Sequence, residues 1–195
     1  MEYLVTMTTR VPDGTTEREV AEVRTREAAH SRELAARGRL LRLWRPPLGP
    51  GEWRSIGLFD DEGPDALERT LAAMPLRVWR TDEPTELGPH PADPGRGEVP
   101  VAADSEEYLV TFAVEGPSGT GSDSPAGSKR AGDVAAEGRL IRLWTLPDRD
   151  RAIGLWQAPG ADRLREILHS GPVAGWRTVD TVPLTRHPSD PAQVT

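Results

Sequence analysis

The chain has 195 residues, no cysteine and a formal net charge of −7 at pH 7. A nucleic-acid backbone or an anionic membrane would repel this charge, so neither is an expected partner. The absence of cysteine excludes disulfides and thiolate metal sites, and neither end carries an apolar targeting segment. We therefore expect a cytoplasmic protein.

The sequence contains an internal duplication. EYLVT at residues 2–6 returns at 107–111, and GRLLRLW at 38–44 returns as GRLIRLW at 138–144. Ile-Gly-Leu, Trp-Arg-Thr and His-Pro follow in the same order in both copies. The repeat predicts one unit over residues 1–91, a linker rich in Pro, Gly and acidic residues over 92–104, and a second unit over 105–195.

The first repeat opens with a predicted strand at residues 2–9 and a Pro-Asp-Gly turn at 12–14. Thr15 or Thr16 can cap a helix that runs to about Arg37 and ends at Gly38. Residues 40–45 and 53–59 form two strands of a predicted β-hairpin, separated by a loop at 46–51.

Pro64 and Asp65 begin a second helix that extends to about Ala73, and a last strand covers residues 76–87 with an edge position or bulge at Pro84. This βαββαβ order is typical of a ferredoxin-like unit, an antiparallel sheet with both helices on one face. Burial of the other face predicts that the two sheets pack together within one chain, as in an intramolecular dimeric α+β barrel.

The second repeat departs from this pattern at its first helix. Pro117, Pro125 and four glycines occur between residues 116 and 127. These residues disfavour a regular helix. We expect a short or displaced helix that begins no earlier than about residue 125, and a mobile segment at 116–124.

Glu27 is the main candidate for chemistry. On a helical wheel it lies near the centre of an apolar stripe, with Arg24 and His30 at the borders. An inward-facing carboxylate must be paired, be hydrogen-bonded or have a raised pKa. A carboxylate with a raised pKa can carry protons near neutral pH. Alternatively, Glu27 pairs with Arg24 or Arg42, or the helix is rotated and Glu27 faces water. The other members of the stripe are Val20, Val23, Ser31 and Leu34.

His30 is a second acid/base candidate, and its alternative role is that of a boundary residue. Strand alternation groups Leu40, Arg42 and Trp44 on one face, and Leu41, Leu43 and Arg45 on the other. If the first group faces the helices, Arg42 and Trp44 bind substrate beside Glu27, although core packing is the safer interpretation of the tryptophan. Trp79 is the third expected substrate contact.

His90 and His187 lie at the ends of their repeats, where an interface or surface role is expected. No second ligand occurs near either histidine at the spacing of a metal site, so no metal is expected.

The chain resembles the muconolactone isomerase family. The resemblance rests on Val-Arg-Thr-Arg-Glu at residues 23–27, residues 38–45 with Leu-Trp-Arg, Leu-Phe-Asp at 58–60, Met-Pro-Leu at 74–76 and the terminal His-Pro at 90–91. In the second repeat it holds only from Gly138 onward. The resemblance implies a dimeric α+β barrel that moves a double bond in an unsaturated lactone by proton transfer, without metal or organic cofactor. Arg24 and Glu27 match the family's lysine and glutamate.

These observations predict a cofactor-free isomerase or cyclase that acts on a small unsaturated lactone or related oxygenated compound, with catalysis in the first repeat. The alternative is a module that kept the fold, lost the chemistry, and binds a small molecule or a protein. A homo-oligomer of the two-unit chain is a further candidate assembly.

Overall fold

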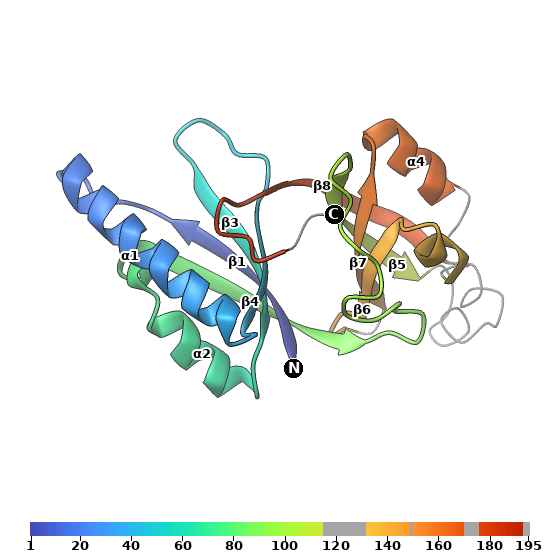
Figure 1. Cartoon of the computed structure of the whole chain (residues 1–195), viewed down its shortest axis with the longest axis horizontal. Helices are drawn as coiled ribbons and strands as arrows, with labels where there is room; N and C mark the ends of the chain where they lie inside the picture. The colour runs from blue at the N-terminus through green and yellow to red at the C-terminus, as the bar shows by residue number, and fades with distance from the viewer. Residues whose placement is uncertain (115–131, 149, 170–175, 193–195) are drawn as a thin grey trace. The chain divides into compact units, whose positions relative to one another are not determined.

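The computed structural model describes residues 1–114, 132–148, 150–169 and 176–192 (Figure 1). The protein has a mixed α+β fold, and every strand pair recorded in it is antiparallel. Its elements are, in chain order, β1 (Glu2–Thr9), α1 (Glu17–Ala36), β2 (Leu40–Arg45), β3 (Trp53–Asp60), α2 (Pro64–Ala72), the 3₁₀ helix η1 (Pro75–Trp79), β4 (Arg80–Pro89), β5 (Glu106–Val114), β6 (Leu140–Thr145), β7 (Arg151–Ala158), α4 (Ala161–His169) and β8 (Trp176–Arg186).

The predicted elements of the first repeat are confirmed with one exception. Thr16 caps α1 through a capping box with Glu19, and Gly38 follows the helix with a φ of 69° that favours glycine. The predicted strand at residues 76–87 is wrong at its start, because η1 occupies residues 75–79 and β4 begins at Arg80. Pro75 lacks an N–H for a strand ladder and suits the first position of a helix.

The chain divides into two compact units. Unit 1 contains residues 1–86 and 185–192, and unit 2 contains residues 87–184. In unit 1, β3 pairs with β1 and β2, and the end of β2 pairs with Thr185 and Arg186. In unit 2, β5 lies between β7 and β8, β7 also pairs with β6, and Gly88 and Pro89 pair with β6. Each unit therefore includes the last segment of the other repeat.

This division differs from the domains expected from the repeats. Residues of the expected linker belong to unit 2, where Val99 and Val101 are buried. The side chain of Gln157 fixes this segment, since its Nε2 donates to the carbonyl of Pro100 at 2.8 Å and its Oε1 accepts from the amide of Ala102 at 2.9 Å.

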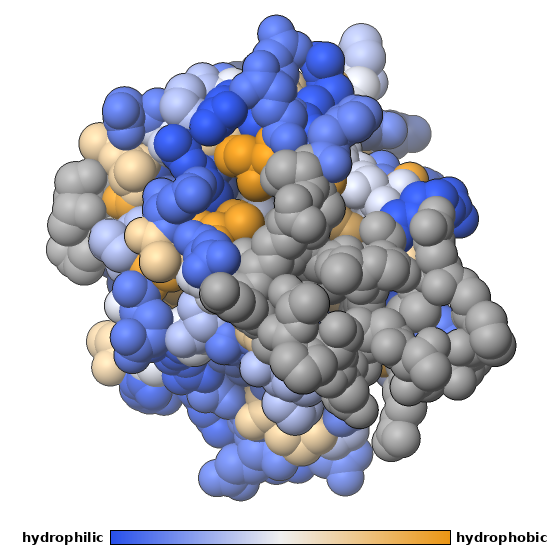
Figure 2. All heavy atoms as spheres, turned by 90° about the vertical axis from the view of Figure 1, so that its right-hand side faces the viewer, coloured by the Kyte–Doolittle hydropathy of each residue, from blue (hydrophilic) through white to orange (hydrophobic). Residues whose placement is uncertain are grey.

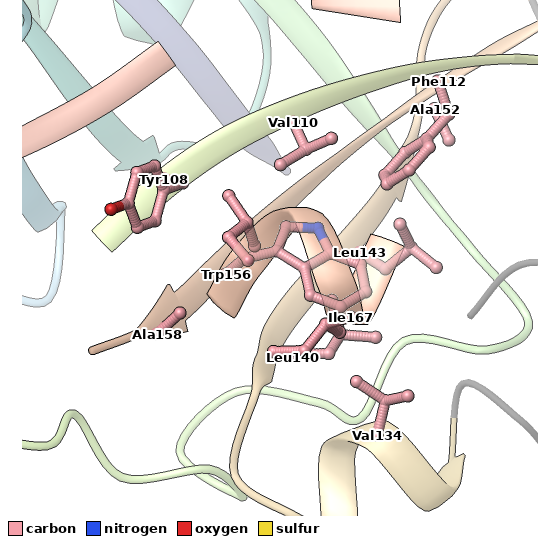
Figure 3. Packing of buried hydrophobic residues seen from close by; sticks show 11 residues of the cluster. Tyr108, Val110, Phe112, Val134, Leu140, Leu143, Ala152, Trp156, Ala158 and Ile167 are labelled. Atoms are coloured by element: carbon pink, nitrogen blue, oxygen red, sulfur yellow. The ribbon is translucent and has the colours of Figure 1, made fainter. Parts of the chain in front are cut away.

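Each unit has its own apolar core, built on matching positions of the two repeats. Tyr3 and Phe59 in unit 1 correspond to Tyr108 and Trp156 in unit 2, and all four are buried. Trp156 lies among the other side chains of the unit 2 core (Figure 3). In unit 1, α1 and α2 lie on the same side of the strands (Figure 1).

A β-bulge changes which side chains of β2 face the core. The pairing of β2 with β3 shifts between Leu40 and Arg42, and β6 has the same shift between Leu140 and Arg142. An extra residue in one strand turns all later side chains to the opposite face. Leu40 and Leu43 both join the core as a result. The expectation that Leu40 shares a face with Arg42 and Trp44 is wrong.

Residues 132–136 of the second repeat are helical, but the segment expected to be mobile lies outside the described residues. No helix in the described ranges is long and apolar enough to cross a membrane. On the face drawn in Figure 2, the coloured part of the surface is mostly hydrophilic, and apolar colour appears in small separate areas.

Candidate active site

A cavity of about 430 Å³ lies within unit 1. One side comes from α1, another from strands β1, β2 and β3, and the rest from η1, the start of β4 and residues 187–189. Its lining residues are Met7, Thr9, Ala21, Arg24, Thr25, Glu27, Ala28, Ser31, Leu43, Arg45, Trp53, Ser55, Met74, Leu76, Arg80, His187, Pro188 and Ser189.

Glu27 lines this cavity and is held by two donors. Its Oε1 accepts a hydrogen bond from Nη1 of Arg80 at 2.8 Å, and its Oε2 accepts one from the backbone amide of Leu76, also at 2.8 Å. Only 12% of the side chain is exposed. Glu27 thus faces inward, but its cationic partner is Arg80 and not Arg24 or Arg42, the two partners considered from the sequence.

Arg80 is itself fixed by a second carboxylate. Its Nε donates to Oδ1 of Asp82 at 2.6 Å and its Nη2 to Oδ2 at 3.2 Å, and both side chains are almost fully buried. Arg77 also pairs with Asp82. Buried charges require such pairing. Arg80 therefore has a fixed orientation toward Glu27, which the sequence signalled only as the repeated Trp-Arg-Thr.

Two further arginines line the cavity. Arg24, expected from the sequence, is exposed and lies over the Trp53 ring, with its Cζ 5.5 Å from the ring centroid. Arg45 lies on β2 after the bulge, and its side chain lines the cavity. Because their charges are positive, the cavity favours an anionic ligand such as a carboxylate.

His187 lines the same cavity, and the sequence analysis did not assign it there. Its backbone amide donates to the carbonyl of Leu43 at 3.0 Å, and its Nδ1 accepts from the amide of Ser189 at 3.1 Å. Burial and the nearby Arg45 and Arg24 lower the pKa of His187 to about 4, against an opposing effect of Asp190. The imidazole is therefore uncharged at neutral pH.

Arg42 and Trp44 do not line the cavity, which corrects their expected role in substrate binding. Arg42 forms a bidentate ion pair with Asp190. The Oδ1 of Asp190 also accepts a hydrogen bond from the amide of Leu43 at 2.9 Å. The guanidinium lies 4.7 Å from the centroid of the fully buried Trp44 ring. These contacts anchor the segment around Asp190 on β2.

Unit 2 has the same arrangement. Arg142 pairs with Asp93, the amide of Leu143 donates to Asp93 at 2.8 Å, and Arg142 lies over Trp144. We call each Arg–Asp arrangement a tail clamp, with Arg42 and Asp190 in unit 1 and Arg142 and Asp93 in unit 2. Both clamps act on a His-Pro-x-Asp sequence, at residues 90–93 and 187–190.

The remaining candidates lie elsewhere. His30 is half-buried and outside the cavity lining, and its Nε2 has no hydrogen-bond partner in the described part of the chain. Trp79 lines a separate, acidic hollow with Asp13, Glu19 and Glu22. No group of three or more potential ligand residues within the described ranges could hold a metal ion.

The fold and cavity define a class of mixed α+β proteins in which a mostly buried carboxylate and several arginines line one cavity. Within this class, the chain belongs to the muconolactone delta-isomerase family, whose profile matches residues 1–93 and 107–190, the two repeats. The resemblance inferred from the sequence is thereby confirmed. The Muconolactone Delta-isomerase of Cupriavidus pinatubonensis (strain JMP 134 / LMG 1197) is 28% identical over 92 residues, which cover 47% of this chain and 97% of that protein.

Three solved structures are similar over nearly the whole chain. A candidate chlorite dismutase has a TM-score of 0.55 at 12% identity, with coverage of 97% of this chain and 96% of its own. A heme-binding protein from Thermus thermophilus has a TM-score of 0.54 at 14% identity, with coverage of 97% of this chain and 93% of its own. A candidate monooxygenase from Lactobacillus acidophilus NCFM has a TM-score of 0.52 at 11% identity, with coverage of 95% of this chain and 93% of its own. At such identities the likeness establishes the fold alone.

Proposed function

We propose that unit 1 is an isomerase that shifts a double bond in a small, anionic unsaturated lactone or a related oxygenated compound. The observation that carries this proposal is the position of Glu27, a fixed carboxylate in the wall of a cavity whose other charged residues are arginines. The family supplies the reaction type, and the charges supply the preference for an anion.

In this proposal, Glu27 takes a proton from an activated carbon of the lactone and a proton returns at the far end of the allylic system. The double bond moves and the product is an isomer, so no other reactant is needed. Arg80 and the Leu76 amide orient the carboxylate, and Arg24 and Arg45 bind the ligand's own carboxylate. Apolar cavity residues such as Met7, Leu43 and Met74 limit the access of water.

A second candidate is a non-catalytic binding module. It is favoured by one observation, the engagement of both Glu27 oxygens by Arg80 and Leu76. A carboxylate held in this way could simply complete the wall of a binding pocket.

The two candidates differ in the fate of muconolactone. In deuterated water, followed by proton NMR, we expect the wild-type chain to isomerise muconolactone and to incorporate solvent deuterium. Glu27→Gln should lower the rate by about 10²- to 10⁴-fold, because the amide cannot carry the proton. Glu22→Gln, on the exposed face of the same helix, is the matched control and should remain active.

Full activity of Glu27→Gln would exclude Glu27 as the proton carrier. A wild-type chain that binds muconolactone without turnover would favour the binding module.

The arrangement of two ferredoxin-like units as an intramolecular dimeric α+β barrel, the cytoplasmic location and any homo-oligomer are further proposals. The repeated element order and the fold of the similar structures support the first of these. Small-angle scattering would test it, since two separated units would give a more extended profile.

A further inference from the structure

Residues 187–190 belong to the second repeat in sequence and to unit 1 in structure. The backbone carbonyl and the backbone amide of Leu43 both hold this segment. The Leu43 carbonyl accepts from the amide of His187, and the Leu43 amide donates to the carboxylate of Asp190, which Arg42 also holds. Within the segment, the Asp190 amide donates to the carbonyl of His187 at 2.8 Å. This geometry fixes the position of His187 at the cavity.

The hydrogen bond at Nδ1 sets the tautomer of the His187 ring. Because Nδ1 accepts from the Ser189 amide, the single proton of the neutral imidazole is on Nε2. No residue in the described ranges accepts a hydrogen bond from this Nε2. The ring therefore carries an N–H donor without an acceptor among the described residues, and it belongs to a residue that lines the cavity.

The charges around the ring keep it neutral. Arg45 on β2 and Arg24 on α1 disfavour a second proton, as does burial, while Asp190 acts in the opposite direction. Glu27 is the carboxylate among the lining residues of the same cavity. An uncharged donor close to two cations suits an oxygen that gains negative charge during the reaction, because it stabilises that charge without adding a competing acid.

We infer that His187 is a substrate-binding residue of the unit 1 site, whose Nε2–H donates to the lactone or carboxylate oxygen of the ligand that Arg24 and Arg45 attract. The second repeat, which lacks a counterpart of Glu27, thereby contributes a ligand-binding side chain to the site of the first. This inference rests on the proposed function for the identity of the ligand, but the state of the ring does not depend on it.

His90 provides a matched control. It occupies the same position in the His-Pro-x-Asp sequence, its Nδ1 accepts from the amide of Ala92 at 3.1 Å, and it belongs to unit 2. The lining of the unit 1 cavity does not include it.

The first test needs no ligand. Long-range ¹H–¹⁵N spectra of the full ¹⁵N-labelled chain, with His187→Asn to assign the signal, should show a neutral His187 ring at pH 7 with the proton on Nε2. A proton on Nδ1, or an imidazolium at pH 7, would overturn the inference.

The second test uses muconolactone as the probe, with two substitutions that separate the ring nitrogens. Asn at position 187 keeps an acceptor near Nδ1 and loses the donor, whereas Gln places an amide N–H near the position of Nε2. We expect His187→Asn to lower kcat/KM by about 10²-fold at an unchanged melting temperature, and His187→Gln to restore at least about tenfold of that loss. His90→Asn should behave as the wild type.

Equal activity of His187→Asn and the wild type would overturn the inference. So would equal losses in the Asn and Gln variants, which would indicate a purely structural role. Retained turnover in Glu27→Gln together with a loss in His187→Asn would refute only the proposed proton carrier. If the wild type neither binds nor converts muconolactone, the proposed substrate fails, and the ring spectra decide the role of His187.

Discussion

Unit 1 and unit 2 contain the same tail clamp, the same bulge after the first leucine of β2 or β6, and a buried aromatic residue two positions after a strand glycine. They differ in the charged residues of the cavity. Arg80 is buried between Glu27 and Asp82, whereas its counterpart Arg177 is exposed. The shared features maintain the fold, and the features found in one unit mark the candidate site.

A second difference concerns the hydrogen bonds of Arg39 and its counterpart Arg139. In unit 1, Arg39 donates to both Asp61 and Thr70, which are themselves hydrogen-bonded at 2.6 Å. Ala158 and Ile167 occupy the equivalent positions in unit 2, where the Nε of Arg139 has no partner among the residues described. A polar network has been replaced there by an apolar core, so such networks are not required by the fold itself.

The largest effect is expected at Arg80. Arg80→Ala would leave Glu27 and Asp82 without their shared cation, and the loss of one partner from a buried ion pair costs about 3–5 kcal/mol. Arg177→Ala should change the free energy of unfolding by less than about 0.5 kcal/mol, because the side chain is exposed. Urea unfolding would measure both, and equal costs would show that the units do not differ as described.

The tail clamps should give a smaller and more symmetric effect. Asp190→Asn and Asp93→Asn each weaken hydrogen bonds to a charged arginine, at an expected cost of roughly 1.5–3 kcal/mol. Only Asp190→Asn should also lower the turnover of muconolactone, because it loosens the segment that holds His187. Equal losses of activity in both variants would contradict a site confined to unit 1.

Acid should destabilise the protein modestly through His90 and His187, the histidines of the two His-Pro-x-Asp sequences. Burial lowers the pKa of His90 against an opposing effect of Asp93, and the pKa of His187 falls to about 4. The unfolded chain takes up protons first, near pH 6.5, so stability is retained above that pH and falls as the pH decreases toward 4. His187→Asn should flatten part of this decline in chemical unfolding between pH 4 and 7, and an unchanged decline would refute the assignment.

The sequence was sufficient to predict the repeat and most element bounds of the first repeat, and it gave the inward position of Glu27 as one of its alternatives. These features depend on local signals, namely the cap at Thr16, the glycine after α1 and the helical stripe. It was insufficient for β2, because one bulge exchanged the faces of the strand and placed Leu43 and Arg45 at the cavity in place of Arg42 and Trp44.

The contacts of longer range were also missed. Arg80 reaches Glu27 across 53 positions and Asp190 reaches Arg42 across 148. The recurrence of Arg-Leu-Trp and His-Pro in both repeats was the available signal. The arginine of the first motif and the aspartate that follows the second form a tail clamp, and they do not mark a substrate site.

If residues of both repeats form one working site, each chain has a single binding site for the ligand. Isothermal titration with muconolactone tests it most directly. We predict one binding site per chain, with an affinity lowered at least about tenfold by Arg45→Ala and unaffected by Arg177→Ala. Two sites per chain, or an affinity that does not depend on Arg45, would contradict the claim.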